Sequence, residues 1–331
     1  MSLNVLFIGG SGEISAACVQ EAIACGHQVT VFNRGMRSDG LTGVNHVAGD
    51  LRQPNAYAAL GSEHFDVVCQ FLGFQVADVE RDIDFFAGRC GHYIFISSAS
   101  CYEKPWHTGR ITETVPLHNP FMAYSRNKAA CEQRLHQAHT NGQLPVTIVR
   151  PSHTYCQRLP STVIDGTHLL WRLRAGKPVL LHDGGATQWT LTRSEDFARG
   201  FVQLFGLPRA LGEAYHITDN VAHSWQHIFA SIAQLAGTDL QTCSVPSTTL
   251  VEHIELLRGP LLGDKANSLL FDNTKIAEAT GGWRCEIGLN DGLAKALTHT
   301  QQQLDAGYAP PQPLDGQIDQ IIAAHTSGAT Q

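Results

Sequence analysis

The chain has 331 residues, enough to bury one large core or two, and 43% hydrophobic with 16% charged residues is typical of a soluble globular protein. The formal charge of −7 argues against a phosphate backbone as the main partner, so we expect no nucleic acid. No run of about 20 apolar residues is present, so we expect no membrane span. Nine cysteines without a Cys-x-x-Cys pair predict free thiols and a cytoplasmic location. We expect no metal site.

The first half of the chain alternates short apolar strands with helices. Strands are predicted over residues 3–8, 28–32, 44–48, 66–72, 93–96 and 146–149. Helices are predicted over residues 14–25, 55–60, 76–88 and 119–140. Because parallel strands joined by helices form right-handed crossovers, we predict an α/β fold with a Rossmann-type doubly wound parallel sheet over residues 1–150.

After residue 150 the alternation loosens. Helices are predicted over residues 162–175, 195–205, 225–235, 248–257 and 289–306, and strands over 179–181, 189–192 and 214–217. We interpret residues 151–308 as a smaller substrate-binding lobe, partly interleaved with the first domain. Residues 309–331 are predicted to form a C-terminal tail with a short amphipathic stretch.

A glycine-rich loop with the sequence GGSGEIS follows the first strand and opens the first helix. Glycine permits the tight turn and lets backbone amides approach a pyrophosphate at the helix N-terminus. The strand–loop–helix setting therefore predicts dinucleotide binding. The carboxylate within the loop fits only if its charge is kept from the phosphates. The predicted cofactor contacts here are Gly9, Ser11, Gly12, Glu13 and Ile14.

The ends of the other strands supply the remaining cofactor contacts. A carboxylate after the second strand would bind the ribose of NAD, whereas an arginine accommodates the 2′-phosphate of NADP. Asn33, Arg34 and Arg37 stand there, so we predict NAD or NADP with a slight preference for NADP; alternatively, Arg34 stacks on adenine. The other predicted contacts are Asp50, Leu51, Phe71, Leu72, Gly73, Ser97, Tyr124, Lys128, Pro151 and His153.

Tyr124 and Lys128 are one helical turn apart on the same face of a predicted helix. Free tyrosine has a pKa of about 10, too high for an efficient base near neutrality. A neighbouring ammonium favours the phenolate. We therefore expect Lys128 to lower the pKa of Tyr124, which would let the phenol act in acid/base catalysis.

Together these residues resemble the extended short-chain dehydrogenase/reductase family, in its NAD-dependent epimerase/dehydratase branch, to which UDP-galactose 4-epimerase belongs. The resemblance spans roughly residues 3–293 and includes EDFA at 195–198, FDNTK at 271–275 and GGW at 281–283. It implies that Tyr124 is the catalytic acid/base, that Lys128 holds the nicotinamide ribose and that Ser98 hydrogen-bonds the reacting oxygen. The predicted substrate contacts are Ser98, Ser100, His153 and Trp189.

Three departures from the family pattern narrow the reaction. Sugar 4,6-dehydratases carry an acidic pair where this chain has Ala99 and Ser100, so that activity is not expected. His153 replaces an asparagine that lies near a nucleotide-sugar diphosphate. Trp189 stands where relatives place an arginine that clamps the diphosphate. Structural roles for His153 and Trp189, and strand-end capping by the serines, remain open alternatives.

The sequence therefore predicts an NAD(P)-dependent oxidoreductase or epimerase that interconverts a secondary alcohol and a ketone on a sugar-like or nucleotide-sugar substrate. Epimerisation and net reduction are not separated at this stage. The alternative is a non-catalytic NAD(P)-binding or RNA-binding regulatory member of the same fold. The resemblance also implies a homodimer through the predicted helices at 76–88 and 119–140, with Phe85, Phe86 and Leu135 either in the seam or facing the sheet.

Overall fold

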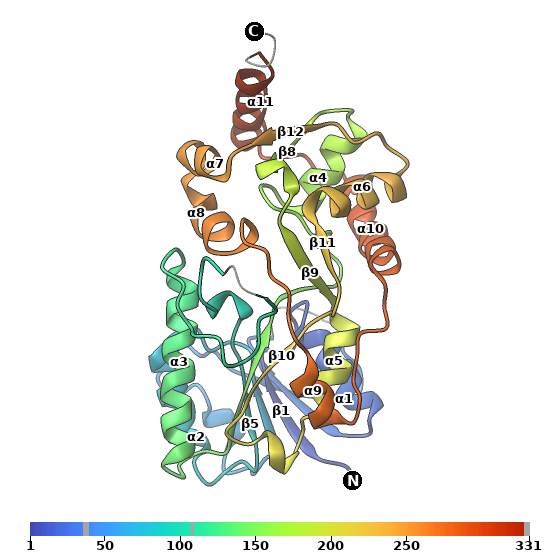
Figure 1. The fold of residues 1–331 in the computed structure, drawn as a ribbon. Helices are drawn as coiled ribbons and strands as arrows, with labels where there is room; N and C mark the ends of the chain where they lie inside the picture. The colour runs from blue at the N-terminus through green and yellow to red at the C-terminus, as the bar shows by residue number, and fades with distance from the viewer. Residues whose placement is uncertain (36–39, 107–108, 328–331) are drawn as a thin grey trace.

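The computed structural model describes residues 1–35, 40–106 and 109–327. A parallel sheet with helices on both faces forms one lobe, and a second lobe of helices and small sheets stands above the carboxyl ends of its strands (Figure 1). The predicted α/β fold of Rossmann type is confirmed.

The boundaries of the regular elements are as follows. The strands are β1 Asn4–Ile8, β2 Gln28–Asn33, β3 Asn45–Ala48, β4 Val67–Gln70, β5 Tyr93–Ile96, β6 Val146–Pro151, β7 His153–Tyr155, β8 Val179–His182, β9 Gln188–Arg193, β10 Ala214–Ile217, β11 Ala222–Ser224 and β12 Thr242–Val245. The helices are α1 Ser15–Ala24, α2 Val76–Phe86, α3 Ala123–Thr140, α4 Gly166–Arg174, α5 Ser194–Val202, α6 Trp225–Ala236, α7 Ser247–His253, α8 Arg258–Pro260, α9 Thr274–Thr280, α10 Leu289–Asp305 and α11 Gln312–Ser327.

The large sheet has seven strands in the order β10-β6-β5-β4-β1-β2-β3, and every neighbouring pair is parallel. β10 comes from the second half of the chain, so the two halves are interleaved. The strand order reverses between β1 and β4. In open α/β sheets, ligands bind at the carboxyl ends of the strands beside such a reversal.

Side chains of β1 alternate between the two faces of the sheet. Val5 and Phe7 pack in one core with α1 and α5, whereas Leu6 and Ile8 pack in the other with α2 and α3. This alternation explains why β1 is apolar throughout, since both faces are covered.

Two of the three residues considered for a dimer seam lie on the inner side of α2 and α3. Phe86 and Leu135 are fully buried in the core beneath the sheet. Phe85 is partly buried and packs with Tyr57, their ring centroids 5.0 Å apart. For Phe86 and Leu135 the structure therefore confirms the alternative that they face the sheet.

Several predicted boundaries differ from the observed ones, among them the helices predicted at 162–175 and 248–257, and three further cases are instructive. The helix expected at 55–60 is only the 3₁₀ turn Ala58–Leu60. β4 ends at Gln70 because its side-chain oxygen accepts the backbone N–H of Leu72 at 2.6 Å and takes that residue out of the ladder. α3 begins at Ala123 rather than four residues earlier, since the Asn119 side chain donates to two distant carbonyls.

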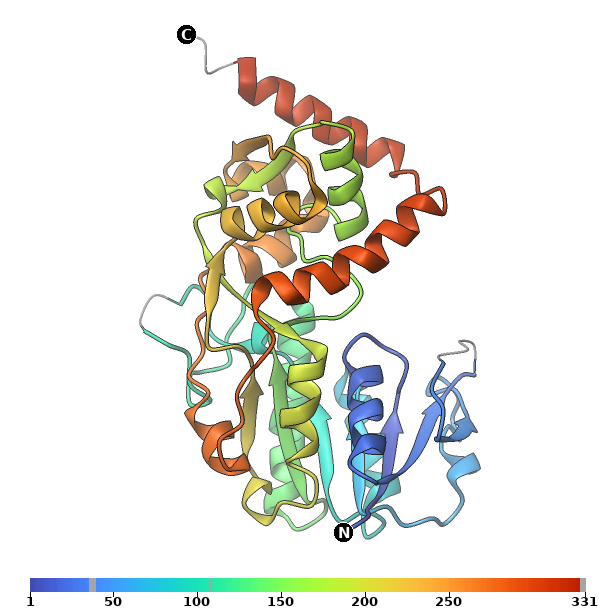
Figure 2. The same cartoon turned by 90° about the vertical axis from the view of Figure 1, so that its right-hand side faces the viewer.

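The C-terminal segment differs from the predicted tail. α11 lies at the end of the second lobe farthest from the N-terminus (Figure 2). Its isoleucines Ile318, Ile321 and Ile322 are buried in a core shared with β12 and α7. Asp315 is also buried and accepts hydrogen bonds from Arg172, Lys177 and His168. An apolar face and a buried ion cluster hold α11 in place.

Asp315→Asn is expected to lower the free energy of unfolding by about 1.5–3 kcal/mol, because a charged acceptor is lost while Arg172 stays buried. Urea denaturation measures the loss. Asp319→Asn is the matched control, since Asp319 contacts Arg172 and Lys177 but its side chain is 46% exposed. Equal losses in the two variants would contradict the anchoring role of Asp315.

The structure also bears on the expected free thiols and on the expected absence of a membrane span. All nine cysteines are free, as predicted. Within the part of the chain that the structure describes, no helix is both long and apolar enough to cross a bilayer.

Candidate active site

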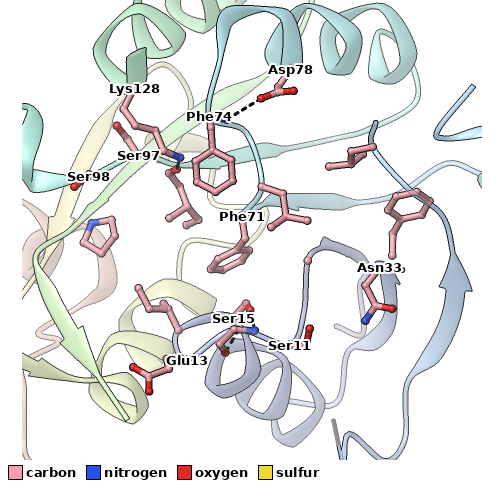
Figure 3. A pocket seen from close by; sticks show the side chains of 18 of the residues that line it. Ser11, Glu13, Ser15, Asn33, Phe71, Phe74, Asp78, Ser97, Ser98 and Lys128 are labelled. Atoms are coloured by element: carbon pink, nitrogen blue, oxygen red, sulfur yellow. Dashed lines mark hydrogen bonds between the residues drawn. The ribbon is translucent and has the colours of Figure 1, made fainter. Parts of the chain in front are cut away.

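A cavity of about 820 Å³ lies at the carboxyl ends of the central strands. In Figure 3, Ser98 and Lys128 lie across this cavity from Ser11 and Ser15 of the glycine loop, and Asn33 lies at the other end. Most of the predicted site residues are brought together here. Those that line the cavity are Gly9, Ser11, Gly12, Glu13, Ile14, Asn33, Arg34, Asp50, Leu51, Phe71, Leu72, Ser97, Ser98, Tyr124, Lys128 and Pro151.

The glycine loop is shaped for close approach of a ligand to its backbone. Gly9 has a φ of +87°, and a Cβ there would lie 2.6 Å from the Leu72 side chain, so only glycine fits. The Ser15 hydroxyl accepts the backbone N–H of Gly12 at 2.8 Å and fixes the turn. α1 begins at Ser15, the last residue of the loop, which also lines the cavity, so the N-terminus of the helix lies at the cavity. This cradle fits the pyrophosphate of a dinucleotide.

The carboxylate of Glu13 has a cationic neighbour in this arrangement. Arg158 places its Nε 3.4 Å from a Glu13 oxygen. Burial raises the pKa of Glu13, and the charge of Arg158 opposes that rise. Arg158 therefore offsets the negative charge of Glu13 in the glycine cradle. The sequence alone did not show this ion pair.

Two arginines and one carboxylate stand near the end of β2. The Asn33 side chain accepts the N–H of Gly35 at 2.8 Å, and Arg34 is exposed beside it. Hydrogen bonds from Arg52 hold the pKa of Asp50 at about 2, so its charge is engaged by that arginine. The charge of Arg34 makes a smaller contribution to the same pKa, and its exposed side chain lines the cavity, where a ligand can reach it. Arg37 lies outside the described residues.

Lys128 is almost completely buried at the floor of the cavity. Its Nζ donates to the backbone oxygens of Gly73 and Ile96, each at 2.6 Å. Burial lowers the pKa of the ammonium to about 8. Gly73 was predicted to contact the cofactor, but it does not line the cavity, and its carbonyl serves Lys128 instead.

Tyr124 differs from the expected electrostatics. Desolvation raises the pKa of its hydroxyl to about 12, with a hydrogen bond to Ser98 opposing the rise, although the residue is 41% exposed. Lys128 lies 5.9 Å from the centre of the tyrosine ring and directs its hydrogen bonds to carbonyls. The prediction that Lys128 lowers the pKa is therefore wrong for this structure, and the phenol is protonated at neutral pH.

The serine run forms a chain of hydroxyls. The Ser98 and Ser100 oxygens are 2.8 Å apart, and the Ser100 and Ser125 oxygens are also 2.8 Å apart. Ser98 also caps the 3₁₀ turn Ala99–Cys101 by accepting the N–H of Ser100. Ser98 therefore both caps the turn and lines the cavity. The hydroxyl of the buried Ser100 holds the Ser98 hydroxyl in place.

A second cavity of about 240 Å³ adjoins the first and shares Ser98, Pro151, Ser152 and Thr154 with it. Ser100, His153 and Trp189, all predicted substrate contacts, line this smaller cavity. His153 was also predicted to contact the cofactor, but it does not line the larger cavity.

Trp189 has mainly a structural position. It is 1% exposed and belongs to the core of the second lobe, where Trp225 lies 5.5 Å away between ring centroids. Its indole N–H donates to His153 Nδ1 at 3.1 Å. The core-packing alternative for Trp189 is confirmed, with the addition that the ring orients His153.

Several cavity residues were not predicted. Arg52, Phe74, Asp78, Ile96, Ser152 and Thr154 line the larger cavity, and Asp264, Lys265 and Leu269 line the smaller one. Asp264 and Lys265 end the π-helical turn Leu261–Lys265. Such turns are frequent at functional sites but carry no sequence signature. The only sequence signal for these cavity residues was the charged pair Asp264 and Lys265 after the apolar residues Leu261 and Leu262.

Two of the sequence motifs that carry the resemblance, EDFA at 195–198 and GGW at 281–283, contact each other. They hold residues 283–287 against α5. Asp196 is fully buried, and its carboxylate accepts the backbone N–H groups of Glu286 and Ile287 at 3.1 and 3.0 Å. Trp283 donates its indole N–H to the Asp196 carbonyl at 3.1 Å. These residues are structural, and they do not line either cavity.

A doubly wound parallel sheet with a glycine cradle at its strand reversal defines the class of Rossmann-type dinucleotide-binding proteins. Residues 5–218 match the NAD dependent epimerase/dehydratase family, and the chain belongs to this family.

The proteins similar to this chain have been named for different functions. A 2′-dehydrokanamycin reductase from Streptomyces kanamyceticus is 27% identical over 258 residues, which cover 77% of this chain and 72% of the relative. A chloroplast stem-loop binding protein of 41 kDa from Arabidopsis thaliana is 24% identical over 88% of this chain and 77% of its own. The structure of a UDP-glucuronic acid 4-epimerase from Bacillus cereus in complex with NAD is 17% identical with a TM-score of 0.72, covering 92% and 99% of the two chains. At that identity the structural likeness supports the fold.

Proposed function

We propose that the protein is an NAD(P)-dependent enzyme that interconverts a secondary alcohol and a ketone on a polyhydroxylated, sugar-like small molecule. The observation that carries the proposal is the meeting of Tyr124, Lys128 and Ser98 with the glycine cradle in one cavity. Membership of an NAD-dependent family supports a nicotinamide cofactor. Cofactor binding is assigned to residues 1–150 and substrate binding to residues 151–308.

The roles of the side chains follow from their positions. When bound, the nicotinamide supplies the hydride acceptor or donor. Tyr124, protonated because of its raised pKa, is suited to give its proton to the oxygen of a ketone. Ser98 would donate a hydrogen bond to the same oxygen, and Lys128 would hold the nicotinamide ribose. In the reductive direction Tyr124 would give its proton to the carbonyl oxygen and regain one from solvent, while a reduced nicotinamide would supply the hydride for the carbonyl carbon.

Reduction and epimerisation differ in how the cofactor is kept. An epimerase reoxidises a retained cofactor in every turnover, whereas a reductase must exchange it. We propose net reduction as the leading reaction, because one relative of this chain is a reductase. Absorbance of the purified, dialysed protein tests this: little bound nicotinamide is expected, and one dialysis-resistant NAD per chain would favour an epimerase.

The non-catalytic and RNA-binding alternatives have less support. Tyr124, Lys128 and Ser98 are all retained, and the formal charge of −7 disfavours a nucleic acid. RNA retention that falls with salt, and that Tyr124→Phe leaves unchanged, would revive them.

Arg34→Ala is expected to weaken binding of NADP(H) by about 10- to 100-fold, as loss of one charge-assisted contact implies, and to affect NAD(H) little. The reason is that Arg34 is exposed at the cavity and forms no ion pair with a carboxylate within the described residues. Fluorescence titration with both cofactors measures the effect. Arg52→Ala is the control, because Arg52 is paired with Asp50. Equal losses for both cofactors would instead indicate stacking of Arg34 on adenine.

We also propose a homodimer formed through the outer faces of α2 and α3. Arg134 and Glu80 join these helices by two hydrogen bonds of 2.6 and 2.9 Å, which makes them one rigid surface. Light scattering of the eluting protein tests the proposal, and a monomer at all concentrations would contradict it.

A further inference from the structure

The smaller cavity contains a histidine whose tautomer is set by its neighbour. The indole nitrogen of Trp189 is a donor only, so His153 Nδ1, 3.1 Å away, must accept and carry no proton. In a neutral ring the proton then sits on Nε2. Within the described residues Nε2 has no hydrogen-bond partner, while His153 lines the cavity. A free N–H donor is therefore available there.

The charges around His153 keep its ring neutral. Burial lowers the pKa of His153 to about 3, and the nearby ammonium of Lys265 adds to this effect. Asp264 is the acidic group on the same wall; its oxygen lies 3.9 Å from Lys265 Nζ. Lys104 stands behind Asp264 and also opposes its burial-raised pKa. His153 is therefore a neutral donor at any pH near neutrality.

The turn that carries Asp264 and Lys265 is held by hydrogen bonds to its carbonyl oxygens. The carbonyl of Lys265 accepts hydrogen bonds from Thr187 at 2.9 Å and His182 at 3.1 Å. The carbonyl of Gly263 accepts one from Asn119 at 2.7 Å, and Asn119 also binds the Ser100 carbonyl. Hydrogen bonds thus hold the backbone on both sides of Asp264, which fixes Asp264 and Lys265 in the cavity lining.

Among the described residues, the lining of the smaller cavity has hydrogen-bond donors and acceptors but no arginine that could clamp a diphosphate. Thr154 lines both cavities, and its buried hydroxyl has no partner within the described chain. No arginine is among the described residues of the smaller cavity, and its volume of about 240 Å³ is below that of typical ligand pockets. The nearby Arg193 is already bound to Glu195 at 2.7 Å. Hydroxyl groups, which both donate and accept, match this lining.

Resting on the function proposed above, we infer that the smaller cavity receives a single hydroxyl-bearing ring without a nucleotide diphosphate. His153 donates from Nε2 to an oxygen of that ring, and Trp189 is the positioning residue that fixes the imidazole tautomer. Asp264 and Lys265, which line the same cavity, supply an acceptor and a donor.

Nitrogen NMR of the full-length protein tests the positioning role without a substrate. His153 is expected in the Nε2–H tautomer, and Trp189→Phe is expected to convert it to a mixture. Trp225→Phe is the matched control, because this neighbouring indole N–H is buried without a partner in the described chain. An Nδ1–H tautomer in the native protein, or equal effects of both variants, would overturn the inference.

Titration of the NAD-saturated protein with glucose and with UDP-glucose tests the ligand class. The His153 Nε2 signal is expected to shift with glucose, and UDP-glucose is expected to bind no tighter. His153→Gln, which retains a donor, should bind glucose better than His153→Phe. At least tenfold tighter binding of UDP-glucose, or a signal that neither sugar moves, would overturn the inference. Failure to bind NAD(P) would instead remove the proposed function, while the tautomer result would stand.

Discussion

Tyr124→Phe is expected to lower turnover by about 10²–10⁴-fold, the range for loss of a general acid, while nicotinamide binding stays nearly intact. The ring itself is retained, so its contact with Phe74, 6.4 Å away between centroids, is preserved. Only the hydroxyl that hydrogen-bonds to Ser98 is lost. Single-turnover kinetics, together with cofactor titration, separate the chemical step from binding.

Tyr308→Phe is the matched control for the loss of a phenolic hydroxyl. The Tyr308 oxygen is buried without a partner in the described chain and lies outside both cavities. Its removal should leave turnover unchanged. Full activity of the Tyr124 variant would show that this hydroxyl is not the acid and would remove the mechanism.

Glu132→Ala is expected to cost about 3–5 kcal/mol of unfolding free energy, because it leaves a buried guanidinium unpaired. Arg150 on β6 contacts both Glu132 oxygens, the shortest at 2.6 Å, and both side chains are over 90% buried. Glu132 is one turn beyond Lys128 on α3. The pair therefore ties the catalytic helix to the sheet. Urea denaturation measures the loss.

The double variant Glu132→Leu with Arg150→Met tests the cause of this loss. Removing both charges together is often neutral, so the double variant should recover most of the stability. If it is as unstable as the single variant, packing rather than the unpaired charge explains the effect.

The sequence by itself determined the sheet and the cofactor cradle. Local signals suffice for both: β1 is apolar because both of its faces are covered, and Gly9 marks a turn that only glycine adopts. The spacing of Tyr124 and Lys128 likewise fixed their common helical face. These features depend on residues near each other in the chain, which is why they were predictable.

Only the tertiary structure decided the electrostatics and the substrate side. The pKa of Tyr124 depends on desolvation and on where Lys128 directs its hydrogen bonds, and neither follows from a four-residue spacing. His153 gains its tautomer from Trp189, and the π-helical turn brings Lys265 to the same cavity from far along the chain. The packing of α11 is a further case, since its ion partners lie in the segment around α4. Burial and long-range pairing are properties of the folded chain, so a local pattern does not encode them.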